Sequence, residues 1–194
     1  MRVHTRVPRA ASNSPCAAPK LTRAAIAIYN VLLVACLAAS IAVATAQSAP
    51  PAENLLNKQA PDFTRHDLDG HALHLNAFRG KVVLLNFWAT WCAPCQVEMP
   101  VFSAWQRQYG PQGLAIIGIS MDDDAAAARQ LVQRLKLDYP NAMGDARLGL
   151  RYGGVLGLPL SFLIDRNSVV RARFQGETDV KVMENQVRAL LAER

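Results

Sequence analysis

The sequence has few cysteines and histidines, and they are not placed as a structural zinc site requires. Only four of its 194 residues are cysteine, and two of these, Cys16 and Cys36, lie in the first 46 residues. A structural zinc site needs four ligands, usually two cysteine pairs or a cysteine pair with a histidine pair. All the histidines precede Cys92, and no ligand pair follows Cys95. No structural zinc is therefore expected at Cys92 and Cys95.

Acidic residues are missing from the start of the chain. Five basic residues and no acidic residue precede position 24, whereas residues 47–194 hold 16 Lys and Arg against 15 Asp and Glu. The formal charge of +6 therefore belongs largely to the first residues. A nearly neutral remainder gives no sign of a phosphate-binding face, so the composition argues against a nucleic-acid partner.

Charge is also absent from residues 24–46, which follow the basic leader as the apolar part of an export signal does. Three outcomes are open. The 23 residues could remain as a membrane anchor, be cleaved after Ala46, or end in a lipobox at Cys36. Positive charge before the segment places the remainder outside the cytoplasm in each case. The predicted organisation is a basic leader (1–23), a signal peptide or membrane anchor (24–46), a linker (47–57) and one domain (58–194).

Hydrophobic periodicity in the domain predicts strands alternating with helices. An Asp-Gly turn after His66 predicts a short hairpin, and residues 76–79 predict one helical turn. Val82–Trp88 is apolar on both sides, as expected for a central strand. The remaining expected elements, in order, are a helix at 93–109, a strand at 114–120, a helix capped by Asp122, Asp123 and Asp124 and ending at Leu135, a short helix at 146–152, an antiparallel strand pair at 160–164 and 169–174, and a helix at 179–191. This order predicts an α/β fold with a mixed central sheet and helices on both faces.

The pair Cys92 and Cys95 falls where the central strand ends and the first long helix begins. Unpaired N–H groups and the positive end of the helix dipole stabilise a thiolate at this place. A second cysteine three residues later lies on the same side of the helix, so the two can form a disulfide. Its small loop would stabilise the fold little. The spacing therefore favours thiol exchange over a structural disulfide.

Several motifs together resemble the thioredoxin superfamily, and most closely its TlpA/ResA-like extracytoplasmic branch. They are Ala60-Pro61-Asp62-Phe63, Phe78-Arg79-Gly80-Lys81, Leu85 to Cys95, Glu98-Met99-Pro100 and Gly157-Leu158-Pro159 before Phe162 to Asp165. The resemblance covers about residues 55–194. It implies a thioredoxin-like fold with an N-terminal hairpin extension, whose only redox group is the Cys92–Cys95 disulfide, with no added cofactor.

The resemblance also implies roles for residues around the disulfide. Pro159 is expected to follow a cis peptide bond and to face the sulfurs, with the backbone of Leu158 free to pair with substrate. Trp91, Ala93 and Pro94 would contact that substrate. Ordinary thioredoxins carry a titrating aspartate six positions before the first cysteine, where this chain has Asn86.

Glu98 is the candidate that replaces this aspartate as the proton acceptor of Cys95. While ionised, it would also raise the pKa of nearby thiols. The alternative without a catalytic role is that Glu98 is a solvated helix residue paired with a nearby basic residue. Trp88 is expected in the core, and His74 on a surface strand.

These roles suggest an extracytoplasmic reductase of protein disulfides. Cys92 would attack the substrate disulfide and Cys95 would resolve the mixed disulfide. The resemblance implies apocytochrome c or copper-site proteins as substrates, and a transmembrane carrier of thiol electrons as donor. Two alternatives stay open. A peroxiredoxin would need a proline before Cys92, and residues 86–91 contain none. A Cu(I) chaperone would use both thiols as soft ligands.

Overall fold

The computed structural model describes residues 54–193. The expected leader, the uncharged segment with Cys36 and most of the expected linker lie outside the described residues. Within residues 54–193, no helix is both long and apolar enough to cross a membrane. Leu55, near the start of this range, is already buried in the core at 4% exposure.

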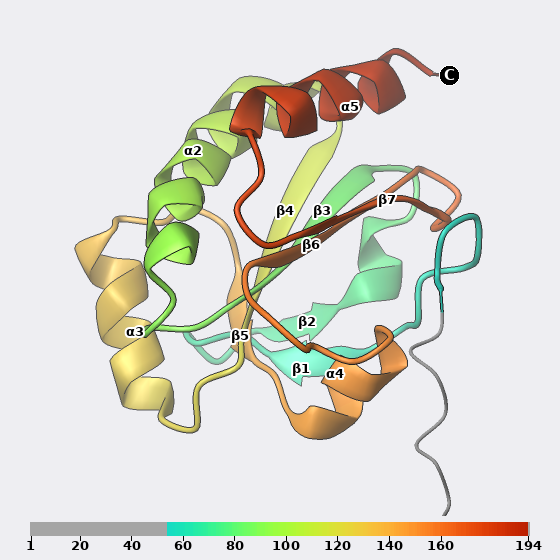
Figure 1. Ribbon diagram of the computed structural model, residues 1–194. Helices are drawn as coiled ribbons and strands as arrows, with labels where there is room; N and C mark the ends of the chain where they lie inside the picture. The colour runs from blue at the N-terminus through green and yellow to red at the C-terminus, as the bar shows by residue number, and fades with distance from the viewer. Residues whose placement is uncertain (1–53, 194) are drawn as a thin grey trace, which may run out of the picture. The chain divides into compact units, whose positions relative to one another are not determined.

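Helices and strands alternate along the described chain much as the hydrophobic pattern predicts (Figure 1). In order they are β1 (Thr64–His66), β2 (Ala72–His74), the 3-10 turn η2 (Leu75–Phe78), β3 (Val82–Trp88), α2 (Ala93–Tyr109), the 3-10 turn η3 (Gly110–Gln112), β4 (Leu114–Ser120), α3 (Ala125–Arg134), β5 (Asn141–Met143), α4 (Ala146–Arg151), β6 (Leu160–Ile164), β7 (Val170–Gln175) and α5 (Val180–Ala192).

The central sheet has the strand order β5-β4-β3-β6-β7. β3 is parallel to β4 on one side and antiparallel to β6 on the other. Every residue of β3 and of β4 is buried, as expected for strands covered on both faces. The predicted mixed sheet is confirmed, and so is the N-terminal hairpin, in which β1 and β2 pair antiparallel.

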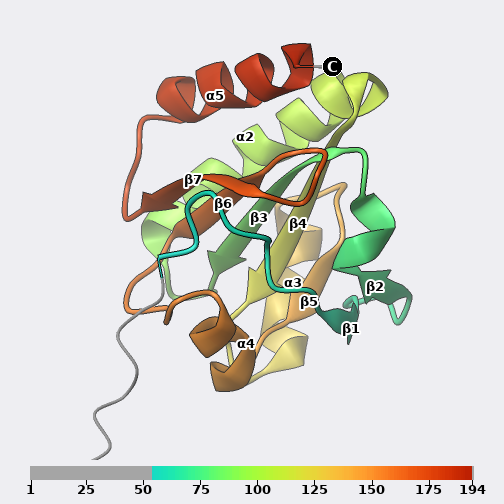
Figure 2. The ribbon, with the colours of Figure 1, turned by 90° about the vertical axis from the view of Figure 1, so that its right-hand side faces the viewer.

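Alternate residues of β3 pack into two separate clusters, and the ribbon shows helices on both sides of the sheet (Figures 1 and 2). Val82 and Leu84 pack in one cluster with α2 and α5. Leu85 and Phe87 pack in a second cluster with the hairpin and with Tyr152, which follows α4. A third cluster joins α3 to the first turns of α2 and contains both cysteines. The helices therefore cover both faces of the sheet, and the dithiol lies at the edge of a packed core.

Two details differ from the sequence prediction. β5 was not predicted, because three residues are too few to show the alternation that marks a strand. It pairs in parallel with β4 and extends the sheet by one strand. In addition, only Asp124 caps α3, by accepting a hydrogen bond from the amide of Ala126 at 2.8 Å. The predicted capping role is therefore wrong for Asp122 and Asp123.

A buried hydrogen bond fixes the contact between β3, β4 and β5. The indole Nε1 of Trp88, a fully buried residue, donates to Oδ1 of Asn141 at 3.0 Å. Gly118 of β4 lies opposite Asn141 in the register and leaves room for this bond. A buried indole N–H needs such an acceptor, so the absence of a side chain at Gly118 is a packing requirement.

We expect Gly118→Ala to lower the free energy of unfolding by about 1–3 kcal/mol. The added Cβ would overlap Oδ1 of Asn141 and approach Nε1 of Trp88 to 2.8 Å. Gly157→Ala is the control, since its Cβ would come no closer than 3.9 Å to its neighbours. Urea unfolding followed by tryptophan fluorescence measures both, and equal stability of the two variants would contradict this account.

Candidate active site

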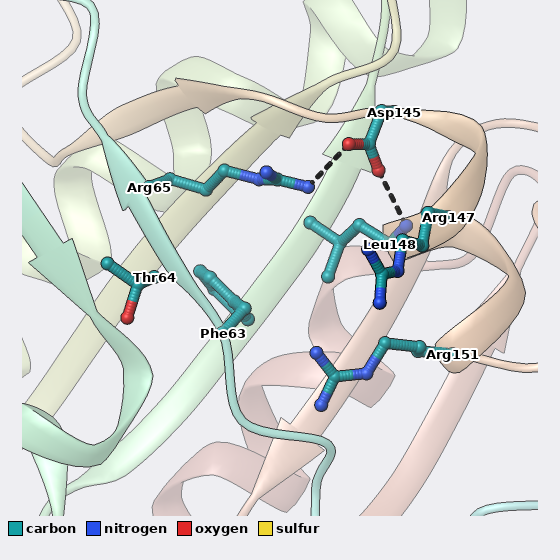
Figure 3. Close-up of a pocket in the computed structure, with 7 residues that line it drawn as sticks. All are labelled: Phe63, Thr64, Arg65, Asp145, Arg147, Leu148 and Arg151. Atoms are coloured by element: carbon teal, nitrogen blue, oxygen red, sulfur yellow. Dashed lines mark hydrogen bonds and ion pairs between the residues drawn. The ribbon is translucent and has the colours of Figure 1, made fainter.

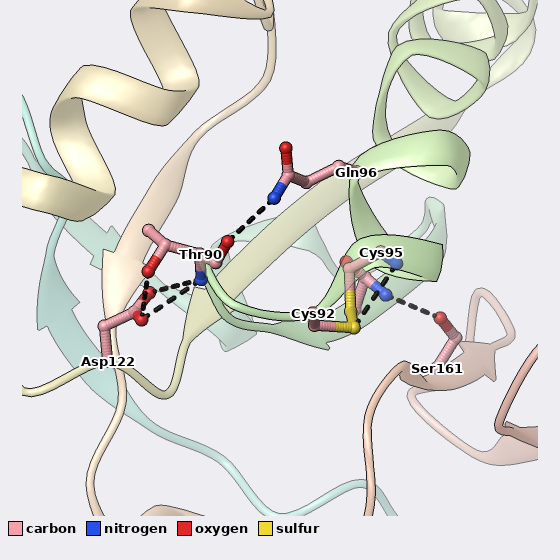
Figure 4. Close-up of a disulfide and its surroundings, with 7 residues drawn as sticks. Thr90, Cys92, Cys95, Gln96, Asp122 and Ser161 are labelled. Atoms are coloured by element: carbon pink, nitrogen blue, oxygen red, sulfur yellow. Dashed lines mark hydrogen bonds between the residues drawn. A yellow bond between two sulfur atoms is a disulfide. The ribbon is translucent and has the colours of Figure 1, made fainter.

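The dithiol lies at the junction of β3 and α2 (Figure 4). Cys92 is the N-cap of α2 with extended backbone angles, and Cys95 lies in the first turn. The two form a disulfide with a Cα–Cα distance of 5.3 Å, within the usual range for such a bridge. The pairing expected from the spacing is confirmed.

Only one sulfur of the pair belongs to a residue with any exposed surface. Cys92 is 4% exposed and Cys95 is fully buried. The backbone N–H of Cys95 donates to Sγ of Cys92 at 3.3 Å, and the first turn of α2 contains no acidic residue. After reduction, this N–H and the helix dipole would favour the thiolate of Cys92. The arrangement suits Cys92 as nucleophile and Cys95 as the resolving thiol.

A carboxylate two residues after the end of β4 holds the segment that leads into Cys92. Oδ2 of Asp122 accepts from the amide of Thr90 at 2.9 Å, and Oδ1 accepts from Oγ1 of Thr90 at 2.7 Å. Ser120 donates to the same carboxylate at 2.8 Å, and Gln96 donates to the carbonyl of Thr90 at 2.7 Å. These bonds fix the turn before the dithiol from two sides (Figure 4).

Sequence reasoning missed this clamp. It assigned Asp122 to helix capping because three consecutive aspartates precede α3. The partner, Thr90, is 32 residues away in the sequence, and only the parallel pairing of β3 with β4 brings the ends of the two strands together. The one available signal was that Thr90 and Asp122 each follow the end of a buried strand. The carboxyl ends of neighbouring parallel strands meet at the same edge of a sheet.

Glu98 lies one turn after Cys95 and is 5% exposed. Burial raises the pKa of its carboxyl to about 7. A hydrogen bond from the backbone of Thr178 opposes this rise, and the nearby carboxylate of Glu177 adds to it. The alternative of a solvated helix residue is wrong, because Glu98 is buried and the loss of solvent dominates its pKa. Its carboxyl can therefore exchange a proton near neutral pH.

Asn86 occupies the position where ordinary thioredoxins have a titrating aspartate. The residue is fully buried, and its Nδ2 donates to Oγ of Ser161 on β6 at 2.9 Å. Its Oδ1 has no hydrogen-bond partner. An amide cannot titrate near neutral pH, so Asn86 cannot serve as the proton acceptor, whereas Glu98 can because its pKa is raised.

Three more of the expected site residues are Leu158, Pro159 and Trp91. The peptide bond between Leu158 and Pro159 is cis, as expected. Leu158 packs against the cluster that contains both cysteines, whereas Trp91 is 72% exposed. Trp88 is fully buried and His74 is exposed on β2, so both of these predictions are confirmed.

A groove of about 490 Å³ adjoins the first turns of α2. One wall comes from α2 and the other from the segment between β7 and α5. Its lining residues are Ala93, Pro94, Val97, Glu98, Glu177, Thr178, Asp179 and Val180. Glu98 and the two residues between the cysteines thus share one concave surface, with carboxylates on both walls.

One cluster in the described range has the spacing of a metal site, and it belongs to the hairpin. It contains Asp67, Asp69 and His71. The carboxylate of Asp67 accepts from the amides of Asp69 and His71 at 3.0 and 2.7 Å and contacts the ring of His71 at 3.3 Å. These bonds stabilise the turn between β1 and β2 and lower the pKa of Asp67 despite its partial burial. The cluster is explained by its turn.

Known proteins share both the sequence pattern and the fold. Residues 56–173 match the AhpC/TSA family. Thiol-disulfide oxidoreductase ResA of Bacillus thuringiensis subsp. konkukian is 32% identical over 160 residues, which cover 82% of this chain and 92% of that protein. Thiol:disulfide interchange protein DsbE of Escherichia coli (strain K12) is 35% identical over 141 residues, covering 70% and 74%.

A solved structure agrees with these relatives. The crystal structure of a thiol:disulfide interchange protein of the thioredoxin family from Chlorobium tepidum TLS superposes with a TM-score of 0.66 at 26% identity. It covers 72% of this chain and all of that one. With Cys92 and Cys95 paired at the start of α2, the chain therefore belongs to the thioredoxin-like AhpC/TSA family and is a thiol–disulfide oxidoreductase similar to ResA and DsbE.

Proposed function

We propose that this oxidoreductase works as an extracytoplasmic reductase of protein disulfides. The observation that favours reduction over oxidation of the substrate is the charge around the two sulfurs. No histidine lies between the cysteines, and the buried Glu98 one turn later disfavours a strongly stabilised thiolate once it ionises. Strong oxidants of this fold, such as DsbA, depend on such stabilisation.

The proposed reaction uses the two sulfurs in sequence. The thiolate of Cys92 attacks one sulfur of the substrate disulfide, and the other substrate sulfur leaves as a thiolate that takes a proton from water. Cys95, once deprotonated, attacks Sγ of Cys92 and releases the second substrate thiol. Two electrons pass to the substrate, and the Cys92–Cys95 disulfide of the described structure is the product state.

Glu98 would take the proton of Cys95 in the second step. Its carboxyl lies one helical turn beyond the resolving cysteine and has a pKa of about 7. A base of this pKa can both accept a proton and return it to solvent near neutral pH. Asn86 cannot fill this role, because an amide does not titrate in that range.

The N-terminal sequence and the family resemblance suggest the setting. A basic leader followed by an uncharged segment directs the domain across a membrane, and in an oxidising compartment a reductase needs electrons delivered to it. A transmembrane dithiol carrier would reduce Cys92–Cys95. Apocytochrome c or copper-site proteins, whose paired cysteines must be reduced before they bind haem or metal, would be the substrates.

The exposed groups beside the sulfurs suit substrate docking. Trp91 offers a large apolar surface next to Cys92, and Ala93 and Pro94 line the neighbouring groove. The backbone of Leu158, before the cis bond to Pro159, would pair with an extended substrate segment. Peroxide turnover would instead indicate a peroxidase, and copper retained after dialysis without disulfide reduction would indicate a Cu(I) chaperone.

Cys95→Ser is expected to trap substrates as mixed disulfides on Cys92, because the resolving thiol is absent. Affinity purification of the full-length variant from the cell envelope, followed by non-reducing electrophoresis, measures the adducts. Cys92→Ser is the matched control and should trap few or none. If Cys92→Ser kept full exchange activity, the assignment of the nucleophile would be wrong.

The reduction potential of the full-length protein should lie below about −180 mV, on the reducing side of protein disulfide isomerase. The reason is that Ala93 and Pro94, the two residues between the cysteines, carry no positive charge that would stabilise the Cys92 thiolate. Equilibration with glutathione or dithiothreitol buffers, followed by thiol alkylation and mass spectrometry, measures it. A potential near the DsbA value of about −120 mV would reverse the proposed direction.

Glu98→Gln should slow the step in which Cys95 attacks Cys92 and releases the reduced substrate. It should also remove a pH dependence of the free energy of unfolding. The folded pKa of Glu98 is raised above its unfolded value, so its stabilising effect is present at low pH and is lost as pH rises towards and through 7. Between pH 5 and pH 8 the oxidised wild type should lose on the order of 2–3 kcal/mol through this group, and the variant should not.

Denaturant unfolding across that pH range and single-turnover kinetics test both effects. Glu177→Gln is the control, because Glu177 is exposed and acts on Glu98 only as a minor influence. Equal pH profiles for Glu98→Gln and the wild type would show that the carboxyl of Glu98 does not titrate near neutrality.

A further inference from the structure

A second pocket, separate from the groove beside α2, lies between the hairpin and α4 (Figure 3). It has a volume of about 200 Å³, and its walls include Phe63 and Leu148. Three arginines line it: Arg65 from β1, and Arg147 and Arg151 from α4. Figure 3 shows Arg65 reaching in from the strand and Arg151 reaching in from the helix.

The pocket has more positive charge than its single lining carboxylate can balance. Asp145 uses Oδ2 to accept from Arg65 at 2.8 Å and Oδ1 to accept from the amide of Leu148 at 2.7 Å. Both of its oxygens are therefore engaged, and its role is to orient Arg65. Counting Arg147 and Arg151, the four charged residues carry a net charge of +2.

The remaining guanidinium groups have unused donors. Among residues 54–193, the guanidinium groups of Arg147 and Arg151 make no hydrogen bond or ion pair, although the charge of Arg147 acts on Asp145. Nε of Arg65 is buried from solvent and has no partner. Arg147 and Arg151 are also four residues apart on one helix, where like charges repel. Nε of Arg65 lies too deep for a ligand to reach, but an oxyanion in the pocket would give acceptors to Arg147 and Arg151 and relieve this repulsion.

We propose that this pocket binds a phosphate group. Guanidinium forks match the oxygens of phosphate with paired hydrogen bonds. Free phosphate as a dianion also neutralises the net charge of +2, whereas a carboxylate or the phosphodiester of a lipid headgroup leaves half of it. The ligand is a free phosphate or a phospholipid headgroup, and binding is independent of the Cys92–Cys95 chemistry.

Titration of the full-length protein in non-ionic detergent with inorganic phosphate tests this proposal, by calorimetry at low ionic strength. The wild type should bind, and the double variant Arg147→Gln/Arg151→Gln should bind at least about tenfold more weakly, because two charged donors are lost. Arg173→Gln is the control, since it removes an exposed arginine on β7 outside this pocket. It should bind as the wild type does.

Disulfide reduction and thermal unfolding show whether the double variant remains folded, and both should match the wild type. Phosphatidylglycerol is then added to the micelles, with phosphatidylcholine for comparison. This step distinguishes a lipid headgroup from free phosphate as the ligand. Competition with phosphate by phosphatidylglycerol assigns the pocket to a lipid headgroup, and no competition assigns it to free phosphate. If the wild type binds no phosphate, or a folded double variant binds it equally well, the proposal is wrong.

Discussion

The placement of one sulfur at the end of a buried strand is the constraint on which the site depends. β3 is held by β4 on one side and by β6 on the other, so its last residues have a fixed position. Cys92 follows as the N-cap of α2, where its sulfur accepts the amide of Cys95. The helix thus supplies a positive end to a sulfur that the sheet holds in place.

Two carboxylates act on this junction in different ways. Asp122 is hydrogen-bonded to Thr90 and Ser120, so its two oxygens hold the approach to Cys92 in one conformation. Glu98 is buried, so its pKa rises and it can exchange a proton. The same functional group becomes a structural clamp in a polar, hydrogen-bonded place and a titrating group in a desolvated one.

Much of the fold and part of the site follow from local pattern. The long buried strands, α2 and the Cys92–Cys95 pair are visible because each depends on neighbours within a few residues. β5 is not visible, since three residues show no period and the strand exists only through its pairing with β4. Asp122 was misassigned for the same reason, because its partner Thr90 is distant in the sequence.

The sequence by itself determined the chemistry that is available: a dithiol at the start of a helix, an asparagine at position 86, and a glutamate one turn beyond Cys95. Only the tertiary structure decided how these groups behave. It buried Glu98 beneath the segment between β7 and α5, and it brought Arg65 of the hairpin to the arginines of α4. Desolvation and charge proximity arise between segments far apart in the chain, and so local sequence does not encode them.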